Sequence, residues 1–141
     1  WRGPGIPKGK VVQEPVSTLD VSATFFDYGG VQASGEVHSR SLRPLLEGDA
    51  TRDYAYNEWG LLPTRCGVAL DLRVARTKTH KLTLELDSGA GELYDLKNDP
   101  HEMDNLFDDA GAAAVRKELT EMIQARPDDM MDPLPPQVGN G

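Results

Sequence analysis

The chain has 141 residues, a length that suits one domain or part of a larger one. Apolar residues make up 38% and aromatic residues 6% of the sequence, and Gly and Pro fill 14 and 10 positions, so we expect many loops and a thin core. No apolar run approaches the roughly 18 residues of a membrane span, and the net charge of −8 argues against nucleic acid as a partner. A single cysteine excludes an internal disulfide framework and a multi-cysteine zinc site.

The negative charge belongs to the last third of the chain. Residues 1–86 hold 11 Lys and Arg against 10 Asp and Glu, whereas residues 87–141 hold 4 against 13. A solvated helix face and tail explain this excess. Calcium capture is the alternative, although the acidic residues between positions 98 and 109 do not follow the ligand spacing of an EF-hand loop.

The first third predicts two helices after an irregular start. Closely spaced Gly and Pro exclude a helix in residues 1–15. Ser17 is a candidate cap for a helix over 18–28, which the pair Gly29-Gly30 ends. A second short helix is expected over 42–47, closed by Gly48. The first helix is expected to bury its large apolar side chains against something large, namely Leu19, Phe25 and Phe26.

The middle of the chain predicts antiparallel strands. Residues from Arg52 to Trp59 alternate, and Gly60 and Pro63 are expected to interrupt the strand. In 81–86 every second residue is Leu, which is typical of a half-buried strand. The turn at 87–91 joins this strand to a hairpin partner. The expected strands therefore cover 52–59, 68–76, 81–86 and 92–96.

The end of the chain predicts a helical turn, a helix and a tail. The turn is expected around 101–106, after Pro100 breaks the sheet. The helix is expected over 112–126, where one apolar stripe recurs at helical spacing. The Pro-rich residues 127–141 follow as a tail without a core pattern. The order indicates an α+β fold, a small antiparallel sheet with flanking helices.

No complete catalytic set emerges from the residues alone. Cys66 is expected to open a strand as a small buried residue, with a reactive thiol beside Arg65 as the alternative. His38, His80 and His101 stand too far apart in sequence for a metal-binding pair. A denser polar group surrounds the interrupted strand, in which Trp59 could stack on a ring and Arg65 could grip an oxyanion. Its members are Arg52, Asn57, Glu58, Trp59 and Arg65.

Two stretches resemble the sulfatase family, in the alkaline-phosphatase-like superfamily. Glu-Leu-Tyr-Asp-Leu at 92–96, followed by Asn-Asp-Pro-x-Glu-x-x-Asn-Leu at 98–106, resembles the C-terminal signature of sulfatases. Pro-Gly-Ile-Pro-Lys-Gly-Lys at 4–10 and Val-Ser-Thr-Leu-Asp at 16–20 look like the sulfatase segment after the central sheet. The two stretches occur in the family's order, and the resemblance covers roughly residues 3–126.

The resemblance implies a sulfate-ester hydrolase whose catalytic motifs lie upstream of this segment. Sulfatases use a formylglycine made from the Cys of Cys-x-Pro-x-Arg together with a divalent cation, usually calcium. Cys66 is followed by Gly-Val-Ala-Leu, so it is not that precursor. No catalytic and no metal-binding residue is therefore assigned to this chain. Asn57, Trp59 and Arg65 are expected at the rim of the substrate pocket.

The resulting hypothesis is the C-terminal portion of a sulfatase, inactive by itself. Residues 1–50 would end the main α/β domain, 51–126 would form a sheet-and-helix subdomain, and 127–141 a tail. The expected partners are the N-terminal catalytic part of the same protein and a small sulfate ester, with self-association as a further option. A soluble bacterial protein of cytoplasm or periplasm is expected. The alternatives are a phosphonate monoester or phosphodiester hydrolase of the same superfamily, and a non-catalytic interaction module.

Overall fold

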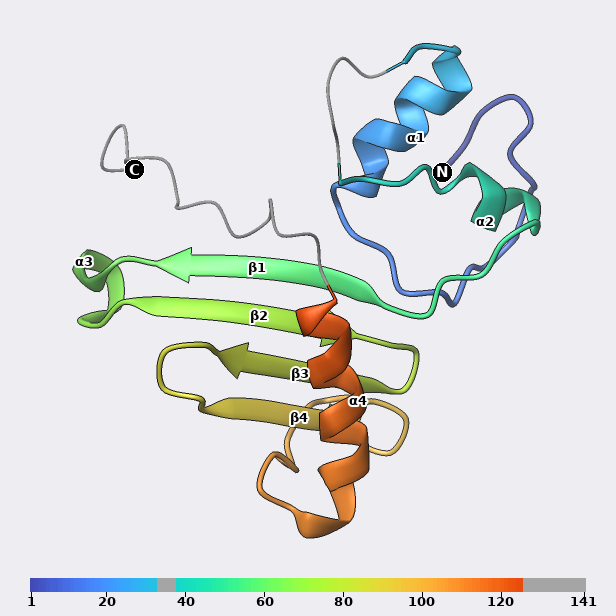
Figure 1. The fold of residues 1–141 in the computed structure, drawn as a ribbon. Coiled ribbons are helices and arrows are strands. Elements are labelled where there is room, and N and C mark those ends of the chain that lie inside the picture. The colour runs from blue at the N-terminus through green and yellow to red at the C-terminus, as the bar shows by residue number, and fades with distance from the viewer. Residues whose placement is uncertain (33–37, 126–141) are drawn as a thin grey trace. The chain divides into compact units, whose positions relative to one another are not determined.

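The computed structural model describes residues 1–32 and 38–125, which form two compact units. One unit comprises Trp1–Ala55 with Arg76–Thr79, and the other comprises Tyr56–Ala75 with the chain from His80 onward. The α+β fold is confirmed (Figure 1). The elements in chain order are α1 (Asp20–Gly29), α2 (Arg43–Glu47), β1 (Ala55–Leu61), α3 (Pro63–Cys66), β2 (Leu70–Arg76), β3 (His80–Glu85), β4 (Gly91–Asp95) and α4 (Ala113–Gln124).

The four strands form one sheet in the order β1-β2-β3-β4, so each strand lies beside its neighbour in sequence. β3 and β4 are antiparallel, with Leu82 opposite Leu93 and Leu84 opposite Gly91. The period of two in β3 is confirmed at Leu82, which is fully buried. Leu86 lies beyond the end of β3 and is 41% exposed, so the alternation stops at the turn.

α4 covers one face of the sheet and closes the core of this unit (Figure 1). Its Leu119 and Ile123 are buried, as expected from their spacing of four residues. The buried core is formed by Ala75, Leu82 and Leu93 from the strands with Leu119 and Ile123 from α4. A 3-10 turn at Ala110–Ala112 precedes the helix, and the Asp109 carboxylate caps that turn by accepting the N–H of Gly111 at 2.6 Å.

The N-terminal unit has a smaller core of its own. Leu42, Leu45 and Leu46 are buried around α2, and Val12 and Tyr28 pack against them. Gly30 ends α1 with φ 64°, and Gly48 ends α2 with φ 95°. Both glycines therefore take the left-handed conformation that the sequence predicted for helix ends.

Several expectations are wrong in detail. Gly60 does not interrupt β1 but lies within it, and Pro63 begins the short helix α3, which Cys66 ends rather than opening a strand. Residues 101–106 are largely irregular instead of forming a helical turn, because the Asp99 carboxylate accepts the N–H groups of Met103 and Asp104. Leu19, Phe25 and Phe26 are exposed among the described residues, so their expected burial against something large stays a prediction, and the buried residues of α1 are Asp20 and Thr24. Arg126, the tail 127–141 and positions 33–37 of the expected loop lie outside the described residues.

Candidate functional site

The three predicted rim residues lie on β1 and α3, and all three are exposed. Asn57 and Trp59 are two positions apart on β1, so their side chains point to the same face of the strand. Trp59 is 64% exposed. Arg65 belongs to the last turn of α3, two residues after the proline that starts this helix. The three exposed residues thus lie on β1 and in α3, and their place at a pocket rim stays a prediction.

The other members of the polar group have structural partners. Glu58 points to the opposite face of β1, where the Tyr56 hydroxyl donates to it at 2.6 Å and the Arg73 Nε lies 3.5 Å from its carboxylate. Arg52 belongs to the N-terminal unit and forms an ion pair with Asp20. These two residues stabilise the fold and are separate from the candidate rim.

Two acidic residues of the stretch 89–106, Asp95 and Asp99, accept hydrogen bonds from backbone N–H groups. The Asp95 carboxylate accepts the N–H of Lys97 at 3.0 Å and the side-chain amide of Asn98 at 2.7 Å. Asp99 accepts the N–H of Met103 at 2.7 Å and that of Asp104 at 2.9 Å. The hydrogen bonds from Asn98 lower the pKa of Asp95 below its usual value. The signature thus encodes a tightly bonded loop.

The Asn105 side chain binds backbone groups of β4, as the backbone of a neighbouring strand would. Its Oδ1 accepts the N–H of Leu93 at 3.0 Å, and its Nδ2 donates to the carbonyl of Gly91 at 3.3 Å. The N–H of Leu106 donates to the carbonyl of Leu93 at 2.8 Å. Because an open strand edge invites pairing with other chains, this loop protects the edge by satisfying its backbone groups.

The calcium and formylglycine that the sulfatase resemblance implies do not fit the described residues. Across residues 1–32 and 38–125, no group of three or more His, Cys, Asp or Glu side chains could hold a metal ion. Asp95 and Asp99 of the signature already accept hydrogen bonds within their loop, and Glu102 forms an ion pair with Lys81. We therefore assign no chemical step to these groups in this chain. Within the same described ranges, no helix has the length and hydropathy needed to cross a bilayer.

Glu85 is a second carboxylate with an unusual environment, at the end of β3. It is 8% exposed and accepts the N–H of Asp71 at 3.0 Å and both the N–H and the hydroxyl of Ser88, at 2.7 and 2.6 Å. The bonds from Ser88 and then from the Asp71 N–H lower the pKa of Glu85 to about 2. Its partners are all parts of the turn and the adjacent strand, so its role is structural.

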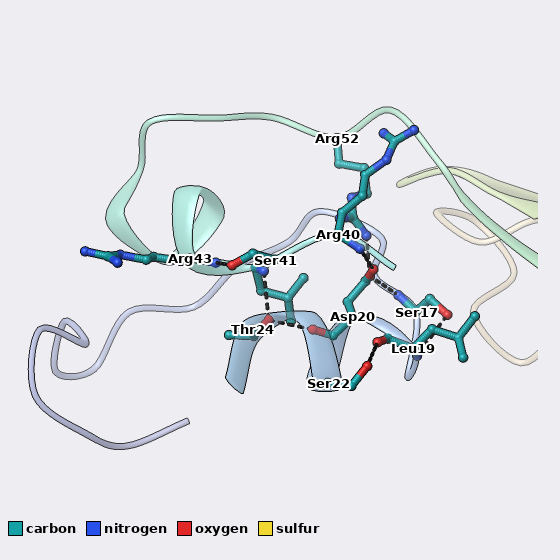
Figure 2. Close-up of polar contacts among 10 residues, drawn as sticks. Ser17, Leu19, Asp20, Ser22, Thr24, Arg40, Ser41, Arg43 and Arg52 are labelled. Atoms are coloured by element: carbon teal, nitrogen blue, oxygen red, sulfur yellow. Dashed lines mark hydrogen bonds and ion pairs between the residues drawn. The ribbon is translucent and has the colours of Figure 1, made fainter. Parts of the chain in front are cut away.

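Asp20 organises the N-terminal unit (Figure 2). It is 3% exposed and accepts the N–H of Ser17 at 2.8 Å, the N–H of Arg40 at 2.9 Å and the Arg52 guanidinium. Burial alone would raise the pKa of Asp20, but the hydrogen bonds from Arg40, Ser17 and Arg52 outweigh it, and the pKa is lowered. The Ser17 N–H donates to Asp20 as in one half of a capping box, and the Ser17 hydroxyl accepts the N–H of Leu19 at 3.3 Å, although the helix itself begins at Asp20.

Lys10 is a structural residue that sequence reasoning missed. Its Nζ donates to the carbonyls of Leu45 and Leu46, at 2.9 and 2.8 Å, near the end of α2. A cation at a helix C-terminus satisfies carbonyls that have no partner within the helix. No local signal marks Lys10 for this role, because its partners lie 35 and 36 residues further along the chain.

Comparison with known proteins identifies the family of this chain. The family model described as N-sulphoglucosamine sulphohydrolase, C-terminal, matches residues 2–129. The chain belongs to the sulfatase family. What it matches is the C-terminal region of that family, in the alkaline-phosphatase-like superfamily.

The similar curated sulfatases are much longer than this chain. An uncharacterized sulfatase of Escherichia coli, YidJ, is 39% identical over 138 residues, which is 91% of this chain and 26% of the relative. An N-acetylglucosamine-6-O-sulfatase of Bacteroides thetaiotaomicron is 32% identical over 112 residues, which is 75% of this chain and 20% of the relative. The chain thus spans about a fifth to a quarter of these two proteins.

Solved structures share the fold and are similarly longer. The structure of BT1596, a 2-O GAG sulfatase, matches with a TM-score of 0.73 and 28% identity, over 93% of this chain and 30% of that one. A phosphonate monoester hydrolase of Agrobacterium radiobacter matches with a TM-score of 0.63 and 29% identity, over 75% of this chain and 23% of that one. The same fold thus occurs in a protein named as a sulfatase and in one named as a phosphonate monoester hydrolase.

Proposed function

We propose that this chain works as the C-terminal part of a sulfate-ester hydrolase, in which the catalytic groups come from the rest of the protein. The observation that carries the proposal is the match of residues 2–129 to a C-terminal sulfatase model, combined with the 20–26% share of the two curated relatives that the chain spans. In a whole sulfatase the nucleophile and the metal ion would belong to the remaining three quarters. In this chain, carboxylates such as those of Asp20, Asp95 and Asp99 accept hydrogen bonds from backbone N–H groups instead.

The part of this chain nearest to the chemistry would be β1 with α3. Asn57 and Trp59 lie on one face of β1, and the exposed Arg65 follows on α3. An indole ring can stack on a sugar or aryl ring, and a guanidinium can bind a sulfate oxygen pair. These properties favour a role at the pocket rim, where such residues would select among substrates without taking part in bond breaking.

We propose different roles for the parts of this chain. Residues 1–50 would complete the main α/β domain, residues 51–126 would form a sheet-and-helix subdomain, and 127–141 would be a tail. A stable sheet closed by α4 suits a subdomain that supplies a rigid support for the rim residues. The N-terminal catalytic part of the protein would be the main partner.

A phosphonate monoester hydrolase is a second candidate, and a specific observation favours it. Two such hydrolases, from Agrobacterium radiobacter and Silicibacter pomeroyi, match with TM-scores of 0.63 and 0.71 and identities of 29% and 25%. Both esters place a tetrahedral, negatively charged group in the site, so the same rim cation would serve either. The distinction must therefore be made by assay.

The test uses a chimera in which residues 1–141 replace the matched C-terminal quarter of the Escherichia coli relative. The chimera and the parent enzyme are assayed side by side on an aryl sulfate and on an aryl phosphonate monoester. We expect the chimera to release sulfate from the aryl sulfate, with a smaller rate on the phosphonate ester. A chimera that cleaves only the phosphonate ester would support the second candidate. A folded chimera inactive on both would contradict the proposal.

A further inference from the structure

A buried carboxylate holds the end of the sheet that carries α3. Figure 1 shows α3 and the turn between β3 and β4 at the same end of the sheet. Glu85 is the last residue of β3, before this turn, and it is 8% exposed. Its carboxylate accepts hydrogen bonds from two segments: the turn, through Ser88, and the start of β2, through the Asp71 N–H. The second of these segments is the one that follows α3 in the chain.

Both backbone polar groups of Asp71 are bound by residues at the end of β3. The Glu85 carboxylate accepts the Asp71 N–H at 3.0 Å, and the N–H of Leu86 donates to the Asp71 carbonyl at 3.0 Å. A donor that loses its acceptor in a partly buried place destabilises the local structure. Glu85 therefore contributes directly to holding the backbone of β2 at Asp71.

The chain between Asp71 and α3 is short. Gly67 follows α3 with φ 84°, and only residues 68–70 separate it from Asp71. Within α3 the N–H of Arg65 donates to the Leu62 carbonyl at 3.0 Å, and the N–H of Gly67 donates to the Pro63 carbonyl at 2.7 Å. A helix of one turn is not stable by itself. The place of α3 therefore depends on the two strands that it joins.

The strand before α3 is linked to the same point of β2. The Glu58 carboxylate of β1 lies 3.5 Å from the Arg73 Nε, and Arg73 forms an ion pair with the Asp71 carboxylate. Arg73 is 7% exposed, so these charges are largely shielded from water. Asp71 thus contacts both sides: its carboxylate is linked through Arg73 to β1, and its N–H is bound by Glu85.

We propose that Glu85 is a positioning residue: by holding Asp71 it sets the place of α3, and with it the place from which the Arg65 guanidinium binds the sulfate ester. The proposal rests on the proposed function, in which Arg65 lies at the pocket rim. It adds a residue that affects substrate affinity without touching the substrate. Because a guanidinium binds an oxyanion through a rigid fork of donors, a displaced α3 weakens that contact.

The first experiment follows amide hydrogen exchange in the 141-residue chain by NMR. The reporters are the amides of Arg65 and Gly67, whose N–H groups form hydrogen bonds of α3. Their exchange is compared with that of the amide of Leu82, a fully buried residue of β3, so that a general loss of stability is recognised. Glu85→Ala removes the acceptor of the Asp71 N–H.

Ser88→Ala is the matched control, because it removes only the hydroxyl bond to Glu85 and leaves the Asp71 N–H bound. We expect Glu85→Ala to speed exchange at the two α3 amides about tenfold relative to Leu82, and Ser88→Ala to leave that ratio within about twofold. A ratio that is the same in the wild type and in Glu85→Ala would overturn the proposal.

The second experiment measures kinetics on the aryl sulfate in the chimera with the Escherichia coli relative. Glu85→Ala is expected to raise KM several-fold and to leave kcat within about twofold, because a substrate contact is displaced while the reacting groups stay in place. A mere loss of folded protein would lower the apparent kcat and leave KM unchanged. In the Arg65→Ala background, Glu85→Ala should raise KM no further. Additive effects on KM would overturn the proposal, and so would an unchanged KM in Glu85→Ala.

The remaining outcomes separate this proposal from the proposed function. A chimera that cleaves the aryl sulfate with an unchanged KM in Arg65→Ala would support the proposed function and overturn the positioning role. A folded chimera that cleaves neither ester would contradict the proposed function, while faster exchange at α3 in Glu85→Ala would still support the positioning of α3. Should Glu85→Ala not fold, Glu85→Gln, which keeps one acceptor oxygen at the same reach, takes its place. Smaller changes of the same sign would then support the proposal, and unchanged exchange and KM would overturn it.

Discussion

Arg52 and Asp20 form an ion pair whose side chains are only 11% and 4% exposed. The pair joins the segment that leads into β1 to the first residue of α1. Asp20 also accepts two backbone N–H groups, so its carboxylate has three donors. Removing such a buried acceptor leaves its donors unsatisfied, which makes this pair a sensitive point of the N-terminal unit.

We expect Asp20→Ala to lower the free energy of unfolding by about 3 kcal/mol, because the N–H groups of Ser17 and Arg40 and the Arg52 guanidinium lose their acceptor. Urea unfolding followed by circular dichroism measures this. Asp53→Ala, at an exposed position nearby, is the control and should change the value by no more than about 0.5 kcal/mol. Equal effects for the two variants would contradict the role of Asp20.

The environment of Glu85 predicts that the stability of the fold decreases at low pH. Its folded-state pKa is about 2, below the ordinary value of 4.5, so its contribution is complete above pH 4.5 and is lost as the pH falls toward 2. Ser88→Ala removes the strongest bond to the carboxylate and should raise the pKa of Glu85 toward 4.5. Carbon NMR titration of the Glu85 carboxyl checks both values. A wild-type midpoint near 4.5 would refute the assignment.

Gly91 meets the Phe107 ring so closely that no side chain fits. A Cβ at Gly91 would lie 2.3 Å from Phe107 Cε2. We expect Gly91→Ala to destabilise the protein by about 1–3 kcal/mol, as for other overpacked sites. In the double variant with Phe107→Ala, the cost of Gly91→Ala should largely disappear, as a double-mutant cycle of unfolding energies would show. Additive effects would mean that the ring is not the obstacle.

Asn105 is expected to protect the edge of β4. Asn105→Ala removes the acceptor of the Leu93 N–H, so exchange of that amide with deuterium should become faster. Asn105→Asp keeps an acceptor but loses the donor to the Gly91 carbonyl, and should have a smaller effect on the same amide. Unchanged exchange at Leu93 in the alanine variant would exclude the protective role.

The rim residues predict a change in substrate binding. In the chimera, Trp59→Ala and Arg65→Ala should raise KM for an aryl sulfate several-fold and leave kcat within about twofold, because a binding contact away from the reacting atoms contributes equally to ground and transition states. Lys117→Ala, on the exposed side of α4, is the control. An unchanged KM in both rim variants would show that Trp59 and Arg65 do not contact the substrate.

The sequence predicted the strands and the long helix well because their patterns are local. The alternating leucines near 82 and the stripe with Leu119 and Ile123 identify their elements and their buried faces. Gly30 and Gly48 end their helices in the left-handed conformation, which glycine adopts readily, so a few neighbouring residues suffice to predict both ends.

What the sequence missed depends on distant partners. The inward side of α1 is polar because Thr24 and Asp27 bind residues 41–43, and no periodicity reveals that. Residues 101–106 do not form the expected helical turn, because the Asp99 carboxylate accepts the N–H groups of Met103 and Asp104. The sequence grouped Arg52 with the candidate rim residues of β1 and α3 only because it is near them in the chain. In the structure Arg52 instead forms an ion pair with Asp20. Their role at a pocket stays a prediction.

We propose that this chain supports a sulfatase without performing the chemistry. Sulfate release from an aryl sulfate and from N-acetylglucosamine 6-sulfate by the purified 141-residue chain tests it most directly, with calcium supplied and the Bacteroides thetaiotaomicron N-acetylglucosamine-6-O-sulfatase as the positive control on the sugar sulfate. We predict a rate for the chain that equals the buffer blank. A rate well above the blank, retained through purification, would contradict the claim and place a catalytic centre within these residues.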